Sequence, residues 1–284
     1  MATEPRRTSS PGGPAAAPML RRARDLQGYA IGAADGDIGD VRDFLFDDRS
    51  WTVRHIVVDT GRWLPGRRVL ISALEIRRID PVGLRLVTDL TRDKVEHSPD
   101  MDADRPVSRQ MEARLAEYYG HPFYWVGPYR WGPVAAPTAD PAAYVPPRGG
   151  PVPPPEAREA DDPHLRSTGE VAGYAIQATD GRLGHVVDFL VEEESWAIRY
   201  LIVDPRSWWP GKHVLIATEW LTGVSWDRSE VAVDLSREQI RSAPEYDPAG
   251  HIDREWETRL FAAYGRPPYW DRRPEGWHLY PPAA

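Results

Sequence analysis

An internal repeat places the strongest constraint on how this 284-residue chain can fold. The stretch Asp43–Ile71 (DFLFDDRSWTVRHIVVDTGRWLPGRRVLI) returns as Asp188–Ile216 (DFLVEEESWAIRYLIVDPRSWWPGKHVLI), so each residue of the first copy corresponds to the residue 145 positions later. The register runs without a gap over Gly28–Trp125 and Gly173–Trp270, and about 37 of these ~98 positions are identical. The sequence therefore predicts one domain, duplicated.

Proline and glycine mark the boundaries between the expected parts of the chain. The 29 prolines and 23 glycines exceed average usage and are expected in turns and linkers, where they favour extended or irregular structure. We expect a disordered tail over residues 1–19, a first domain over 20–128, a Pro-rich linker over 129–164, a second domain over 165–273 and a C-terminal tail over 274–284. Each copy is long enough to bury a core of its own.

Each copy contains short apolar segments separated by Gly, Pro, Asp or Ser. Asp35-Gly36 and Asp180-Gly181 are strong hairpin signals, because glycine adopts positive φ at no steric cost. The expected strands of the first copy are Gly28–Ala34, Ile38–Phe46, Trp51–Asp59, Val69–Ser72, Ile76–Asp80 and Leu84–Asp89. Six short strands at this spacing predict a mainly β fold, with one small antiparallel β-barrel per copy.

The hydrophobic period changes after the strands. Ser108–Tyr119 and Asp253–Tyr264 each predict one amphipathic helix that begins at a capping residue and ends before a glycine. In the first copy, an apolar stripe with helical spacing predicts a face packed on the barrel; it consists of Met111, Leu115 and Tyr119.

The order of motifs in both copies resembles the PRC-barrel domain family. The residues that carry the resemblance in the first copy are DG at 35–36, G-x-V-x-DFL at 39–45, WLPG at 63–66, DLTRD at 89–93, SPD at 98–100 and YYG at 118–120. The family takes its name from the cytoplasmic domain of the photosynthetic reaction centre H subunit, and it includes the C-terminal domain of the ribosome maturation factor RimM. The resemblance covers residues 20–125 and 165–270 and is greatest to stand-alone bacterial members.

This resemblance implies a non-enzymatic module that contacts other macromolecules. We expect a tandem-barrel scaffold or adaptor that binds protein partners, with the cytoplasmic face of an integral membrane complex as one setting. Two alternatives follow from the family: an accessory of photosynthetic or respiratory electron transport, and a ribosome-assembly factor. The H subunit has a transmembrane helix before its barrel and RimM has a different N-terminal domain, so neither role transfers directly to this sequence.

Composition and motifs narrow the chemistry further. The chain has no cysteine, which excludes disulfides and thiolate chemistry and suits a reducing cytoplasm. A net charge of −8 disfavours direct nucleic-acid binding, and no apolar run is long enough to span a membrane. No histidine inside the repeats recurs in the other copy, and no nucleophile, phosphate-loop or metal-ligand motif is present. We therefore expect no enzymatic activity, metal or cofactor.

Two sets of residues remain as candidate sites. The aromatic loops either fold back as lids on the barrels or form contact surfaces for a partner; they contain Trp63, Pro65, Arg67 and Arg68 in the first copy and Trp208, Trp209 and Pro210 in the second. The second set recurs at matched positions, where structural ion pairs or turns are the expected role and a partner-binding patch the alternative; it consists of Arg54, Asp59, Arg199 and Asp204.

Overall fold

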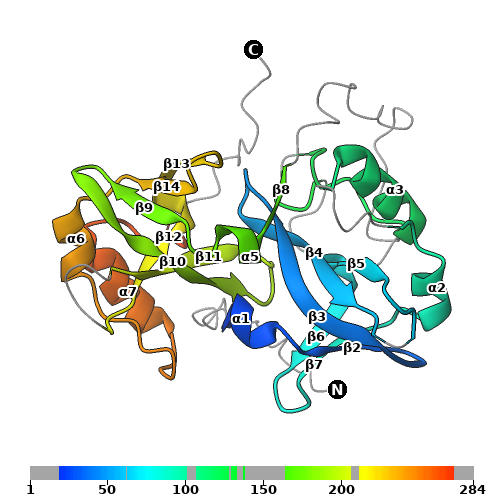
Figure 1. Cartoon of the computed structure of the whole chain (residues 1–284). Helices are drawn as coiled ribbons and strands as arrows, with labels where there is room; N and C mark the ends of the chain where they lie inside the picture. Colours follow the sequence, from blue (N-terminus) through cyan, green and yellow to red (C-terminus); the bar gives the residue numbers. More distant parts are fainter. Residues whose placement is uncertain are drawn as a thin grey trace, which may run out of the picture.

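The protein was analysed as a computed structural model, which describes residues 19–61, 63–100, 107–127, 129–132, 137, 164–205 and 211–271. The fold is mainly β, as predicted, with two seven-stranded sheets that each curl into a half-barrel (Figure 1). No helix within the described residues is long and apolar enough to cross a membrane.

Both copies build the same series of elements. The first copy contains β1 (Leu20–Arg22), α1 (Ala23–Leu26), β2 (Ala30–Ala33), β3 (Gly36–Asp47), β4 (Thr52–Asp59), β5 (Arg68–Ser72), η1 (Ala73–Glu75), β6 (Ile76–Asp80), β7 (Arg85–Thr88), α2 (Arg92–Glu96) and α3 (Arg109–Tyr119). The second contains β8 (Leu165–Ser167), α5 (Thr168–Val171), β9 (Ala175–Ala178), β10 (Gly181–Glu192), β11 (Ile198–Asp204), β12 (Val214–Ala217), η3 (Thr218–Trp220), β13 (Leu221–Ser225), β14 (Glu230–Val233), α6 (Arg237–Ser242) and α7 (Arg254–Ala263).

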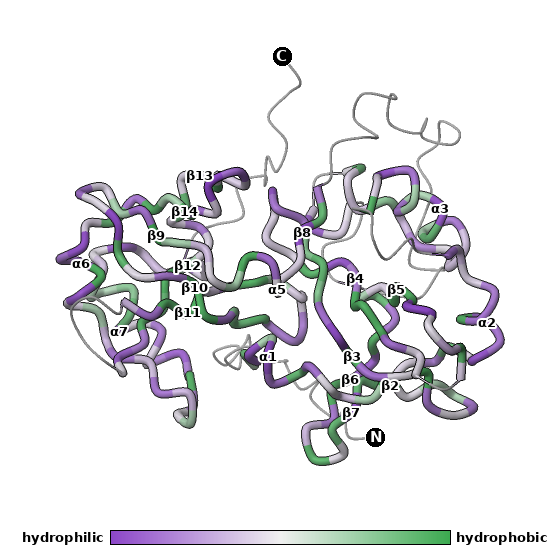
Figure 2. The backbone as a smooth tube through the Cα atoms, viewed as in Figure 1, coloured by the Kyte–Doolittle hydropathy of each residue, from purple (hydrophilic) through white to green (hydrophobic). Residues whose placement is uncertain are grey.

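The strand order is the same in both sheets. It is β5-β4-β3-β2-β7-β6 in the first and β12-β11-β10-β9-β14-β13 in the second. Neighbouring strands pair antiparallel, with one exception per sheet that the sequence did not indicate: β2 and β7 pair in parallel, as do β9 and β14. Strands β4 and β11 are buried along most of their length, and Figure 2 shows green, hydrophobic segments interrupted by hydrophilic residues in both sheets.

The two long helices begin and end where the sequence predicted. The side chain of Ser108 caps α3 by accepting from the backbone N–H of Met111, and Asp253 caps α7 in the same way. Gly120 ends α3 in the left-handed conformation, with φ of +76°. Leu115 and Tyr119 are buried in the core and Met111 packs against it, so the predicted stripe is confirmed.

The first strand of each copy pairs with the sheet of the other copy. β1 runs antiparallel to the end of β10, with Leu20 opposite Glu192, and β8 runs antiparallel to the end of β3, with Leu45 opposite Ser167. Figure 1 shows α1 of the first copy and α5 of the second close together at the centre of the molecule. The copies are thus joined by a reciprocal exchange of strands, in the manner of a domain swap within one chain.

Direct contacts between the barrels reinforce this exchange. The backbone N–H of Val53 donates to the carbonyl of Trp196 at 2.9 Å, and the N–H of Ile198 donates to the carbonyl of Trp51 at 2.7 Å. The ring of Phe46 lies 4.9 Å from that of Trp51 and 6.1 Å from that of Phe189, so the aromatic core continues from one barrel into the other.

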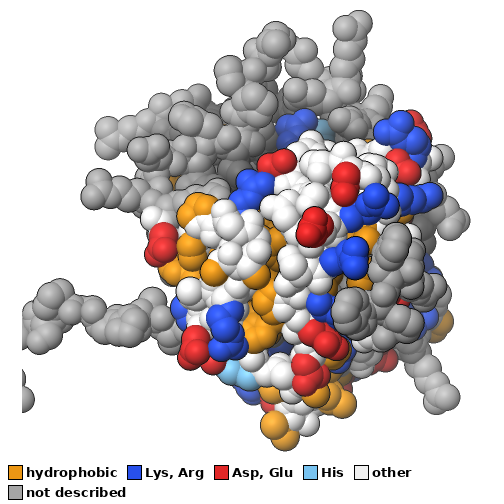
Figure 3. All heavy atoms as spheres, turned by 90° about the vertical axis from the view of Figure 1, so that its left-hand side faces the viewer, with side chains coloured by type: hydrophobic (Ala, Val, Ile, Leu, Met, Phe, Trp, Pro, Cys, Tyr) orange, Lys and Arg blue, Asp and Glu red, His pale blue; other side chains and the backbone are white. Residues whose placement is uncertain are grey.

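The outer face of the second copy has no extended field of one charge. Figure 3 shows basic and acidic side chains interspersed on this face around a narrow apolar strip. Ion pairs near the surface of the second copy include Arg237 with Asp180 at 3.5 Å and Arg266 with Asp234 at 2.7 Å. Such a face offers no broad basic surface for a polyanion.

Candidate functional site

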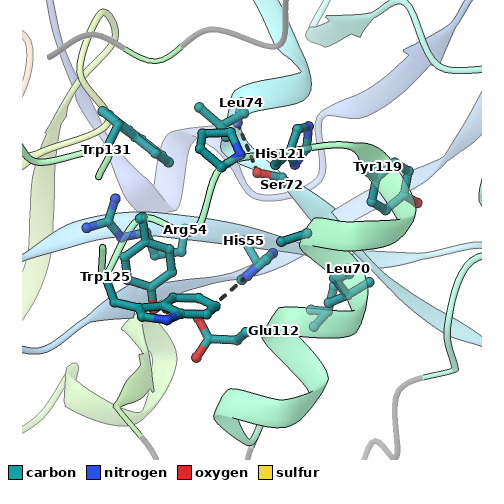
Figure 4. Close-up of a pocket in the computed structure, with 14 residues that line it drawn as sticks. Arg54, His55, Leu70, Ser72, Leu74, Glu112, Tyr119, His121, Trp125 and Trp131 are labelled. Atoms are coloured by element: carbon teal, nitrogen blue, oxygen red, sulfur yellow. Dashed lines mark hydrogen bonds and ion pairs between the residues drawn. The ribbon is translucent and has the colours of Figure 1, made fainter. Parts of the chain in front are cut away.

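A small cavity lies inside the first barrel, between the sheet, α3 and the segment that follows α3 (Figure 4). Its walls are mostly apolar and aromatic, but several polar groups face into it. The lining consists of Arg54, His55, Leu70, Ser72, Leu74, Glu112, Leu115, Ala116, Tyr119, His121, Pro122, Tyr124, Trp125 and Trp131. The volume that the centre of a water molecule can occupy is about 20 Å³, so the cavity has room for about one water molecule.

His55 on β4 is the central polar group of this cavity. Its Nε2 lies 4.0 Å from Oε2 of Glu112, and its Nδ1 has no hydrogen-bond partner among the described residues. Burial, together with the nearby His121, Arg54 and Arg109, lowers the pKa of His55 to about 3. The imidazole is therefore neutral at physiological pH.

Glu112 on α3 is buried beside His55. It accepts a hydrogen bond from the Tyr124 hydroxyl, and its other oxygen lies 3.2 Å from Nη1 of Arg109. Burial raises the pKa of this carboxyl to about 7, although Arg109 and the Tyr124 hydroxyl favour the charged form. A carboxyl that titrates near neutrality inside a barrel core makes this cluster responsive to pH.

A second histidine–carboxylate pair closes the other side of the cavity. Nε2 of His121 lies 2.7 Å from Oε1 of Glu75 in η1, and both side chains are largely buried. Among the described residues, no group of three His, Asp or Glu side chains is arranged to hold a metal ion.

In the second barrel the equivalent space is filled by rings. The positions of His55, Glu75 and Ala116 are occupied there by Tyr200, Trp220 and Phe261, whose volumes are larger. The Trp220 and Phe261 rings meet edge to face at 5.1 Å, and the Tyr200 hydroxyl donates to Glu257, the counterpart of Glu112. The two copies therefore share a fold but not an interior.

Sequence reasoning missed this cavity, although one signal was available. His55 and His121 do not recur in the second copy, so a search for repeated site residues passes over them. Comparing side-chain volumes at the same positions would have shown that His55, Glu75 and Ala116 together leave space that the second copy fills.

The predicted aromatic loop of the first copy is largely tied down. Trp63 is half-buried against the core, with the guanidinium carbon of Arg92 4.6 Å from its ring centroid. Arg67 donates to the carbonyl of Ser98 at 2.7 Å and pairs with Asp100 at 2.6 Å. Pro65 and Arg68 are exposed, while Trp208, Trp209 and Pro210 of the second loop lie outside the described residues.

The arginines and aspartates singled out from the repeat do not pair with one another. Arg54 is buried, with Nη2 3.0 Å from the Ser50 hydroxyl and its guanidinium carbon 3.8 Å from the centroid of the Tyr124 ring. Arg199 pairs with Glu192 at 2.7 Å.

The two aspartates of that set lie at the far ends of their strands. Asp59 accepts from the N–H of Gly61 at 2.9 Å and lies 3.6 Å from Arg42. Asp204 ends β11, opposite His185 on β10. The arginines thus form structural ion pairs with Asp47 and its counterpart Glu192, and Asp59 stabilises the turn after β4.

One exposed apolar feature differs between the copies. The turn between β6 and β7, residues 81–84, is here called the first-copy tip. Val82 is 95% exposed and Leu84 is 56% exposed, and Leu84 adopts a φ of +50°. The corresponding residues of the second copy are Asp227 and Ser229, which are polar.

Comparisons with known proteins give little further information. No known protein family matches the chain. A protein of Deinococcus radiodurans described as uncharacterised is 33% identical over 85 residues, which is 30% of this chain and 30% of that protein. The chain therefore spans less than a third of that relative.

Replacing Glu112 with glutamine should change how stability depends on pH. The pKa of this carboxyl rises from 4.5 to about 7 on folding, so its contribution to stability falls as pH rises through that window. The E112Q variant has no ionisable carboxyl at this position, so it lacks this pH-dependent contribution to stability. Its free energy of unfolding relative to wild type should therefore improve by up to about 3 kcal/mol between pH 4.5 and pH 8.

Urea unfolding at several pH values measures this difference. The control is Glu255→Gln, which changes an exposed glutamate on α7 and should leave the pH dependence unchanged. Parallel pH profiles for wild type and E112Q would contradict the assignment of a raised pKa to Glu112.

Proposed function

We propose that this protein is a non-enzymatic, PRC-barrel-like scaffold that binds a protein partner through the first-copy tip. The order of repeated motifs and the pair of curled sheets, each with a C-terminal helix, support the family resemblance. The exchanged strands hold both barrels in one framework, as a scaffold requires. A cytoplasmic setting beside a membrane complex is part of the proposal, and the electron-transport and ribosome-assembly roles stay predictions from the resemblance.

The observation that carries the proposal is the composition of the tip. Single exposed apolar side chains are common, but here Val82 and Leu84 are exposed within the same turn. Leu84 also adopts a left-handed conformation that is unfavourable for a branched side chain. The second copy forms the same turn with Ser229 at a φ of +52°, so the fold does not require leucine there.

The surroundings of the tip favour a protein over a polyanion. The rim contains two ion pairs, Arg85–Asp37 at 2.6 Å and Arg78–Asp80 at 3.3 Å. Their charges balance, so the rim has little net attraction for nucleic acid or an anionic membrane. An apolar centre with a polar rim is the usual arrangement of a protein–protein contact.

Site-specific photo-crosslinking tests this function in cells of the source organism. A photoreactive amino acid at position 82 should capture a discrete protein, whereas the same group at position 227 of the second copy should not. In the double variant Val82→Asp/Leu84→Ser the crosslinker is moved to Pro81. The yield of crosslinked product should then fall at least about 10-fold. It installs the second copy's own residues, so it should fold as well as wild type.

The reverse exchange is the matched control. Asp227→Val/Ser229→Leu places the apolar pair on the second copy, where the surrounding rim differs, and should not create the same product. Equal crosslinking from positions 82 and 227, or no loss in the double variant, would overturn the proposal.

A further inference from the structure

A second cavity lies where the two copies meet, apart from both the first-barrel cavity and the tip. On one side it is lined by the turn between β3 and β4 of the first copy and by Arg130. On the other side it is lined by β11, the junction of β12 with η3, and Tyr269 of the second copy. Its described lining consists of Arg49, Ser50, Trp51, Arg130, Arg199, Ala217, Thr218, Glu219 and Tyr269. We call it the junction cleft; its volume is about 160 Å³, enough for a small organic or inorganic ion.

Three arginines line this cleft, Arg49, Arg130 and Arg199, whereas Glu219 is the only carboxylate in the described lining. The chain as a whole has a net charge of −8, so this local excess of positive charge does not follow from composition.

The fold holds two of these arginines in place. Nη1 of Arg130 donates to the carbonyl of Ser50 at 2.6 Å and to the hydroxyl of Thr52 at 2.5 Å. Arg199 pairs with Glu192 at 2.7 Å, and its guanidinium carbon lies 4.5 Å from the ring centroid of Tyr269. Arginines fixed in this way lose little side-chain freedom when a ligand binds.

The positive charges are also close enough to destabilise one another. Burial and the neighbouring Arg199 and Arg54 lower the pKa of Arg130 to about 9, although Glu192 and Asp47 act in the opposite direction. An anion in the cleft would relieve this repulsion and would be attracted more strongly than at an exposed surface.

From this geometry we propose that the junction cleft binds a phosphoryl group, as free phosphate or as the phosphate of a small monoester. One guanidinium fork satisfies both oxygens of a carboxylate, but a tetrahedral phosphate offers enough oxygens to accept from several arginines. Because Arg49 comes from the first copy and Arg199 from the second, the site exists only when the two barrels are joined. The proposal does not depend on the protein-binding function of the tip.

Isothermal titration of the full chain with inorganic phosphate, at ionic strength matched by sodium chloride, tests the site. A second arm uses glycerol phosphate to distinguish free phosphate from a monoester. We expect saturable binding and a rise in the unfolding temperature that chloride does not reproduce. Arg49→Gln and Arg130→Gln should each weaken binding about 10-fold.

Two variants separate loss of binding from loss of folding. Arg49 is exposed, so Arg49→Gln should fold normally and still bind weakly. Arg182→Gln, which changes an exposed arginine on β10 outside the cleft, should bind like wild type. Failure to saturate, an equal effect of chloride, or unchanged affinity in both Arg49→Gln and Arg130→Gln would overturn the proposal.

Discussion

An isolated first copy, residues 19–132, should be a dimer in solution rather than a stable monomer. On its own it loses β8, which pairs with the end of β3 in the intact chain. It also exposes Phe46 and Trp51, which pack at the junction against the second copy. Burial of each large apolar side chain contributes about 1.5–3 kcal/mol, so the exposed junction should find another copy.

The expected dimer repeats the exchange seen in the full chain. In the intact protein Arg21 on β1 pairs with Glu193, and Arg166 on β8 lies 3.3 Å from Asp48. Since Asp48 corresponds to Glu193, the β1 strand of one isolated first copy finds an acidic partner at the same place in another. Size-exclusion chromatography with light scattering would show the dimer, and a monomer that unfolds cooperatively would contradict this expectation.

Replacing Gly39 with alanine should destabilise the protein by at least about 3 kcal/mol. A Cβ at Gly39 would lie 2.1 Å from the carbonyl oxygen of Asp59, and one at Gly184 would lie 2.0 Å from that of Asp204. These oxygens belong to backbone that cannot move aside cheaply. Gly184 also has a φ of +57°, which adds strain for any other residue.

Thermal unfolding measures this effect, and we expect the unfolding temperature to fall by ~10 °C. The control is Gly223→Ala on β13, where no atom lies within 4 Å of the added Cβ and φ is ordinary. That change should stay within about 0.5 kcal/mol of wild type. Equal stability of the Gly39 and Gly223 variants would show that β3 and β4 are not packed as described.

The elements of each copy could be predicted because local rules agree with the fold. Asp-Gly turns, β-branched runs and helix caps gave the strands and the helix that begins after Ser108, since each signal depends on neighbouring residues. The strand exchange could not be predicted in the same way. Leu20–Arg22 and Leu165–Ser167 have equivalent sequences, and a strand pairs equally well with its own sheet or with a copy of it.

The candidate sites were harder to predict because they depend on contacts between distant residues. Arg54 forms a structural ion pair with Asp47 at 4.0 Å, as expected, but its stacking on Tyr124, far along the chain, could not be predicted. The first-barrel cavity exists because Ala116 replaces the ring of Phe261, a difference that hydrophobic patterning does not register. The junction cleft requires Arg49 of the first copy and Arg199 of the second to line one cavity, which depends on the contact between the two copies.

Differential scanning calorimetry of the full chain tests the central structural claim most directly, namely that exchanged strands make the two copies one cooperative unit. The comparison is between the calorimetric enthalpy and the van't Hoff enthalpy of unfolding. A single transition with a ratio near 1 is expected, and Gly39→Ala should shift that whole transition. A ratio near 2, or a Gly39→Ala scan in which half of the enthalpy keeps the wild-type unfolding temperature, would mean that the barrels unfold independently and would contradict the claim.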